Sequence, residues 1–87
     1  MWVNINYLAA GALRQYYGRT PGPFAETARV LGLQIERTVV ATVAGEYART
    51  GFLWESYRDH DGGGRGTHPF TGWTALVALL ATGRYPF

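Results

Sequence analysis

Residues 23–51 read PFAETARVLGLQIERTVVATVAGEYARTG and carry the clearest structural signal in the 87-residue chain. Apolar side chains recur there at steps of four and three residues, as on one face of an α-helix: Phe24, Ala28, Leu31, Ile35, Val39 and Val43. Pro23 suits the first turn of a helix, and Gly51 suits the position just past its end. The pattern predicts a helix from about Pro23 to Thr50 with one buried face. The opposite, solvated face is expected to hold the acidic residues Glu26, Glu36 and Glu46.

The flanking segments predict two further helices. Residues 3–17 are apolar on nearly every face and stop at Gly18, and residues 73–81 are also almost wholly apolar, with Thr71 as the expected N-cap. A helix without a polar face is normally buried. Two inner helices therefore alternate with one outer helix, and the chain is predicted to be all-α. Such alternation is typical of a two-ring helical toroid, which three helices alone cannot close.

The stretch 52–71, between the second and third predicted helices, has no periodicity. A loop of about 20 residues is uncommon in a compact domain unless it is functional. Asp59 and Asp61 lack the later ligands of a calcium loop, so Asp61 and the glycines after it indicate a turn and a close backbone approach. The glycine run lacks the ending of a phosphate-binding loop, and His60 and His68 lack metal-ligand spacing. Neither a metal nor a cofactor is predicted.

Composition indicates one domain with more apolar surface than a free-standing unit of this size needs. Hydrophobic residues make up 47% of the chain and charged residues 16%, so a partner or further chain is expected to cover part of the surface. A net charge of +2, with arginines spread along the chain, predicts neither nucleic-acid nor membrane binding. No apolar run is long enough for a membrane span. Residues 1–4 have no feature of a signal peptide.

The densest chemical signal is Trp54-Glu55-Ser56-Tyr57, at the start of the long loop. A carboxylate beside aromatic rings suits carbohydrate, because rings pack on the C–H face of a sugar while the carboxylate handles hydroxyls or activates water. From the residues alone a second interpretation stands. In it Glu55 pairs with an arginine or caps a helix, and Trp54 and Tyr57 belong to the core.

Three blocks in register resemble the C-terminal region of glycoside hydrolase family 63, and most closely its processing α-glucosidases. Residues 2–9, WVNINYLA, are similar to the family's Trp-x-Asn-x-Asn-Tyr-Leu helix. Residues 49–57, RTGFLWESY, are similar to its Thr-Gly-x-x-Trp-Glu-x-Tyr block. The glycine-rich residues 62–66, followed by PFTGWT at 69–74, are similar to its loop and Phe-Thr-Gly-Trp-Thr block. The resemblance covers nearly all of the chain.

The resemblance implies that residues 1–87 are the C-terminal portion of an (α/α)6-barrel catalytic domain, without a second domain. It implies an inverting glycosidase that removes the terminal α-1,2-linked glucose from the N-glycan precursor in the endoplasmic reticulum lumen. Glu55 matches the family's general base. The residues implied to line the sugar pocket are Trp2, Asn6, Trp54, Tyr57, Phe70 and Trp73. The family's general acid is an Asp in a region that this chain does not contain, so the isolated chain is expected to be inactive.

Two other readings remain open at this point. Trehalases and other (α/α)6 glycosidases also carry a Glu-x-Tyr, a glycine-rich loop and a Gly-Trp-Thr near the C-terminus. Alternatively, the chain is a non-catalytic remnant, or a helical interaction module that uses its apolar helices as the interface.

Overall fold

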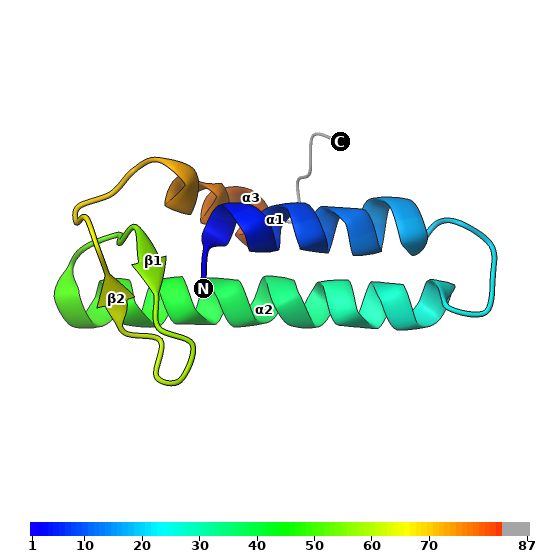
Figure 1. The fold of residues 1–87 in the computed structure, drawn as a ribbon, viewed down its shortest axis with the longest axis horizontal. Coiled ribbons are helices and arrows are strands. Elements are labelled where there is room, and N and C mark those ends of the chain that lie inside the picture. Colours follow the sequence, from blue (N-terminus) through cyan, green and yellow to red (C-terminus); the bar gives the residue numbers. More distant parts are fainter. Residues whose placement is uncertain (83–87) are drawn as a thin grey trace.

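A computed structural model describes residues 1–82 of the chain. Helix α1 (Val3–Gly11) runs directly into the π-helical η1 (Ala12–Tyr17), and α2 (Ala25–Thr50) follows. Strands β1 (Ser56–Tyr57) and β2 (Gly64–Arg65) precede the 3₁₀ helix η2 (Trp73–Leu76), which continues into α3 (Val77–Thr82) (Figure 1). The prediction of an all-α fold with a long loop between the second and third helices is confirmed. An antiparallel hairpin with two residues in each strand interrupts the loop.

The helices form an antiparallel hairpin that carries the rest of the chain. The continuous helix of α1 and η1 lies along α2, and α3 packs against both (Figure 1). The β1–β2 hairpin lies at the end of the structure where α2 finishes and α1 begins. The Tyr57 amide donates a hydrogen bond to the Met1 carbonyl at 2.9 Å, which ties β1 to the segment before α1. The long loop is therefore anchored at one end of the helical hairpin.

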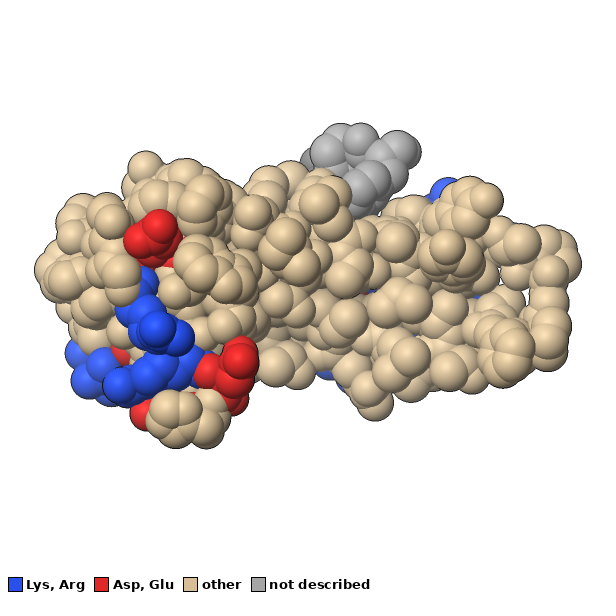
Figure 2. Space-filling model, viewed as in Figure 1, with Lys and Arg blue, Asp and Glu red and all other residues tan. Residues whose placement is uncertain are grey.

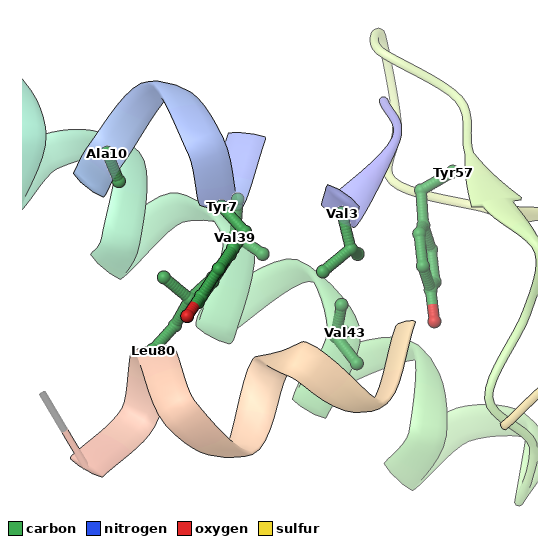
Figure 3. Packing of buried hydrophobic residues seen from close by; sticks show 7 residues of the cluster. All are labelled: Val3, Tyr7, Ala10, Val39, Val43, Tyr57 and Leu80. Atoms are coloured by element: carbon green, nitrogen blue, oxygen red, sulfur yellow. The ribbon is translucent and has the colours of Figure 1, made fainter. Parts of the chain in front are cut away.

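The hydrophobic core joins α1, α2, β1 and α3 (Figure 3). Its buried members are Val3, Tyr7 and Ala10 of α1, Val39 and Val43 of α2, Tyr57 of β1 and Leu80 of α3. Full burial of one aliphatic side chain contributes roughly 1.5–3 kcal/mol. Because Tyr57 is completely buried beside Val3, the start of the functional loop is part of the core.

The buried face of α2 differs from the predicted stripe in its first half. Leu31 is 45% exposed, whereas Gly32 and Glu36 are buried. The cause is Arg14 of η1, whose Nη1 donates to both carboxylate oxygens of Glu36 at 2.8 and 2.9 Å. A side chain at position 32 would collide with the Arg14 stem, so glycine is needed there. Glu26 is solvated as predicted.

The predicted solvation of Glu36 and Glu46 is wrong, because each carboxylate is buried against an arginine. At the helix ends, Gly51 adopts the left-handed conformation expected of a C-cap glycine, with φ of 79°. The predicted cap at Thr71 is also wrong. Gly72 precedes η2, and no side chain caps that helix.

The first helix is buried on one side only, contrary to the prediction that it is an inner helix on all faces. Ile5 is 59% exposed and Leu8 57% exposed. The physical reason is that α2 and α3 cover a single side of α1. The face of the molecule seen in Figure 2 is largely uncharged, and most of its visible charges lie at the end with the β hairpin. No helix within residues 1–82 is both long and apolar enough to cross a membrane.

Candidate functional site

Glu55 lies immediately before β1, where the chain leaves α2 and enters the hairpin. Its amide donates to the Thr67 carbonyl at 2.9 Å, and the Thr67 amide donates to Glu55 Oε1 at 3.1 Å. The two residues thus continue the hairpin by one reciprocal pair, in which a side chain replaces a backbone acceptor. This pairing fixes the direction of the Glu55 carboxylate relative to the hairpin.

One oxygen of this carboxylate is held and the other is open. Oε2 of Glu55 accepts no hydrogen bond and pairs with no cation among residues 1–82, and it is not a buried atom. An anchored carboxylate with a solvent-reachable oxygen can accept a proton from a water molecule. The alternative prediction, that Glu55 pairs with an arginine, finds no support in the described residues.

The backbone around Glu55 is held by η2. The indole Nε1 of Trp73 donates to the Glu55 carbonyl at 2.9 Å, and the Thr74 hydroxyl donates to the Trp54 carbonyl at 2.6 Å. Thr74 is fully buried, so its hydrogen bond is shielded from water. Two segments that are far apart in sequence therefore meet at residues 54 and 55.

Two groups of aromatic rings adjoin this backbone. In the first, which we name the Trp54 cluster, the rings of Trp54 and His68 stack with centroids 3.8 Å apart, and Phe52 lies against both. In the second, the Trp73 cluster, Trp73 contacts Phe70 at 4.8 Å and Trp2 at 6.0 Å between centroids. Aromatic faces near a carboxylate are suited to the C–H surfaces of a sugar.

Four of the six predicted pocket residues, Trp2, Trp54, Phe70 and Trp73, thus lie in these two clusters, and two are placed differently. Tyr57 is fully buried in the core, where its hydroxyl accepts a hydrogen bond from the Trp54 amide at 3.2 Å. Burial is the main cause that raises the pKa of this phenol above its usual value. The Asn6 amide group donates to the Trp2 carbonyl at 2.8 Å, and Asn6 lines a groove of about 200 Å³ between α1 and α2.

Two glycines let the hairpin approach these side chains. A Cβ at Gly64 would overlap the Trp54 indole, and one at Gly66 would lie 2.5 Å from Glu55 Oε1. Gly66 also has φ of +77°, which disfavours any side chain. The predicted close backbone approach is confirmed, and Trp54 and Glu55 are what the backbone approaches.

Sequence reasoning missed Glu46, which supports the hairpin from α2. Its Oε2 accepts a hydrogen bond from the Gly64 amide at 2.6 Å, and both oxygens pair with Arg49. The Arg49 guanidinium, followed by the Gly64 amide, lowers the pKa of Glu46 from 4.5 to about 2. The spacing from Glu46 to Arg49 was visible in the sequence. The hydrogen bond between Glu46 and Gly64 was not, because the two residues are 18 positions apart.

The tip of the hairpin is a turn closed by Asp61. Its Oδ1 accepts a hydrogen bond from the Gly63 amide at 2.9 Å, and Arg58 forms an ion pair with the carboxylate. The Gly63 bond is the main cause that lowers the pKa of Asp61. This confirms the turn predicted at this position. Within residues 1–82, no group of three His, Asp or Glu side chains is arranged to hold a metal ion.

Comparison with known proteins identifies the family of the chain. Residues 1–83 match the Glycosyl hydrolase family 63 C-terminal domain. The chain is 34% identical over 86 residues to mannosyl-oligosaccharide glucosidase GCS1 of Arabidopsis thaliana. This alignment covers 99% of the chain and 10% of that protein. It is 39% identical over 85 residues to a probable mannosyl-oligosaccharide glucosidase of Schizosaccharomyces pombe, with 98% and 10% covered.

A third relative is the mannosyl-oligosaccharide glucosidase of Saccharomyces cerevisiae, at 35% identity over 83 residues, with 92% of the chain and 10% of that protein covered. The chain therefore spans about a tenth of the length of these curated relatives. The family match extends over the helices, the hairpin and Glu55 alike. The chain belongs to glycosyl hydrolase family 63.

Proposed function

We propose that this chain supplies the general-base segment of an inverting α-glucosidase, with Glu55 as the base. The observation that carries the proposal is the Glu55 carboxylate itself, with one oxygen held by the Thr67 amide and the other open to solvent. In an inverting glycosidase one carboxylate activates water while a carboxylic acid on the other side protonates the leaving oxygen. The anchored oxygen sets the direction of the base, and the open oxygen takes the proton.

The substrate proposed is a glucosylated oligosaccharide, and the bond cleaved is the terminal α-1,2-glucosidic bond of the N-glycan precursor. The relatives' names support this substrate class, since three of them are mannosyl-oligosaccharide glucosidases or probable ones. Such a substrate would place the reaction in the endoplasmic reticulum lumen. The Trp54 and Trp73 clusters, which include Trp2 and Phe70, would provide ring faces for the sugar, while Asn6 and Tyr57 would support them from α1 and the core.

The general acid is proposed to come from another part of a longer polypeptide, as is the remainder of the barrel. The exposed apolar side chains of the first helix, Ile5 and Leu8, together with Tyr16 of η1, provide a surface for that packing. In this proposal the 87-residue chain alone binds a substrate fragment at most and does not hydrolyse it. Detectable turnover of an α-1,2-glucoside by the purified chain would contradict this part.

A chimera tests the role of Glu55. The segment of the Schizosaccharomyces pombe relative that matches this chain is replaced by the chain, and release of glucose from an α-1,2-glucosylated oligosaccharide is measured. We expect Glu55→Gln to lower kcat by about 10²–10⁴-fold, because the amide keeps the Thr67 contact but cannot accept a proton. Glu26→Gln, on the exposed face of α2, is the control.

Full activity of the Glu55→Gln chimera would refute the assignment of the base. The chimera that retains Glu55 distinguishes the substrate classes, because a trehalase-like site would hydrolyse trehalose in preference to the α-1,2-glucosylated oligosaccharide. A chimera that folds but cleaves neither substrate would support the reading of the chain as a non-catalytic remnant.

A further inference from the structure

Glu46 occupies an unusual place for an acidic residue of a surface helix. It lies near the C-terminal end of α2, its residue is only 6% exposed, and both carboxylate oxygens are engaged. Arg49 Nε donates to Oε1 at 2.6 Å, and Arg49 Nη2 donates to Oε2 at 2.8 Å. A buried carboxylate is tolerated only when it is paired and hydrogen-bonded in this way.

The same helix contains a matched pair that shows what is special about Glu46. Glu26 and Arg29 have the same residue types and the same i,i+3 spacing, yet the Glu26 side chain is 73% exposed. Of these two glutamates, Glu46 is the one that contacts the hairpin, through its hydrogen bond from the Gly64 amide at 2.6 Å. The Glu46–Arg49 pair is therefore more than a helix-surface ion pair, because it joins α2 to β2.

From Gly64 the connection leads to Glu55 in a few steps. Gly64 pairs with Tyr57, Arg65 pairs with Ser56, and Thr67 then bonds Glu55 through both backbone and carboxylate. A hairpin with two residues in each strand is not stable by itself in water. Its position must come from anchors outside the strands, and Glu46 provides one from the end of a 26-residue helix.

We propose that Glu46 is a positioning residue, which fixes the β1–β2 hairpin on α2 and thereby directs the carboxylate of Glu55. The inference rests on the proposed function of Glu55 as the base. Two properties of the Glu46 side chain can be tested separately. Its negative charge stabilises the ion pair with Arg49, and its length brings an oxygen within hydrogen-bond distance of the Gly64 amide. The positioning of Glu55 depends on the length of the Glu46 side chain.

Two substitutions in the chimera described above test these properties separately. Glu46→Gln keeps the length and a carbonyl oxygen for Gly64 but loses the charge, and we expect it to retain most of kcat. Glu46→Asp keeps the charge but withdraws the oxygens by one methylene. We expect it to lower kcat by about 100-fold with little change in KM, because a displacement of about 1 Å of a catalytic group can cost that much.

Amide hydrogen exchange of the complete 87-residue chain gives a readout that does not depend on activity. In Glu46→Asp the Gly64 and Thr67 amides should exchange faster than in the parent, while the Val43 amide in the core of α2 should not. Glu26→Asp is the control, and it should leave all three amides unchanged.

The outcomes are distinct for the two proposals. If Glu55→Gln abolishes turnover but Glu46→Asp leaves both kcat and Thr67 exchange unchanged, the positioning role is wrong and the base stands. If Glu46→Gln loses as much kcat as Glu46→Asp, the charge of Glu46 and not the length of its side chain controls kcat, and the inference is also overturned. If Glu55→Gln retains activity, the proposed base is wrong, whatever the exchange data show.

Discussion

Thr67 and Glu55 bond each other twice, through the amide of Glu55 to the carbonyl of Thr67 and through the amide of Thr67 to Oε1 of Glu55. The acidic side chain therefore completes the hairpin ladder with one oxygen and leaves the other available. The Thr67 amide fixes the direction of the carboxylate, and the second oxygen can take a proton from water, as a general base requires.

Gly66 is a position near the site where a single added carbon would meet the Glu55 carboxylate. Gly66→Ala places a Cβ about 2.5 Å from Glu55 Oε1, at a position with φ of +77°. Gly51→Ala is the matched control, because Gly51 has φ of +79° but open space around it. We expect both to reduce the free energy of unfolding by about 1–2 kcal/mol, the cost of a left-handed residue with a side chain. Only Gly66→Ala should also reduce kcat of the chimera, and equal kcat for the two would contradict the contact.

Two glycines of α2 should respond to alanine in opposite directions. At Gly45 nothing lies within 4 Å of an added Cβ, so Gly45→Ala should stabilise the chain by about 0.5–1 kcal/mol through helix propensity. At Gly32 the added Cβ meets the Arg14 stem. Overpacking of about 1–3 kcal/mol should exceed the gain in propensity and destabilise the chain. Urea denaturation of the two variants measures both signs, and a stabilised Gly32→Ala would show that Arg14 does not cross α2 there.

Local patterns predicted the helices well and the tertiary pairing poorly. The burial of Ala28, Val39 and Val43 and the C-cap at Gly51 were predictable because they depend on neighbours along one helix. The burial of Glu36 and Glu46 was not, since each carboxylate is compensated by a group from a different element, Arg14 in one case and Gly64 in the other.

The same distinction holds at the site. Trp54 and Glu55 were visible as a dense aromatic and acidic motif, and the family blocks singled out Glu55. Two contacts depend on how the loop folds back: the stacking of His68 on Trp54, and the hydrogen bond from Trp73 to the Glu55 carbonyl. An aperiodic stretch carries no register from which such contacts follow, so neither contact was predicted, although the family resemblance placed Trp73 among the pocket residues.

Acid should weaken the chain through Glu46 in a defined interval of pH. The folded-state pKa of Glu46 is about 2, below the ordinary 4.5, because Arg49 and the Gly64 amide favour the carboxylate. Stabilisation from a lowered pKa is complete above the unfolded value and is lost as pH falls toward the folded value. Glu46→Gln removes this term, so the stability difference between parent and variant should shrink from about pH 4.5 to about pH 2.

Urea midpoints of the parent and Glu46→Gln across that interval measure the effect. Arg49 and Arg58 face Glu46 and stay charged throughout, and Asp61, whose pKa is also lowered, is present in both proteins and cancels. Glu26→Gln should show no comparable convergence with the parent. A constant difference between parent and Glu46→Gln over the whole interval would show that Arg49 and the Gly64 amide do not lower the pKa of Glu46.

Chemical rescue can test whether Glu55 acts on the face of the sugar opposite the leaving group. Glu55→Ala in the chimera removes the base and leaves space beside the Thr67 amide, so hydrolysis should fall by about 10²–10⁴-fold. Azide, a small anion that needs no deprotonation, should then attack the anomeric carbon. A C–N bond forms there as the bond to the leaving oxygen breaks, and that oxygen takes its proton from the general acid.

Because azide replaces the activated water, it attacks the face opposite the leaving group, and an α-glucoside should yield β-glucosyl azide. Nuclear magnetic resonance of the product identifies the anomer, and Glu26→Ala with azide is the control that should form none. Formation of the α-azide would instead indicate that Glu55 is the acid/base residue of a retaining mechanism. If azide restores no turnover although the Glu55→Ala chimera is folded, Glu55 supports the hairpin and the base must lie elsewhere.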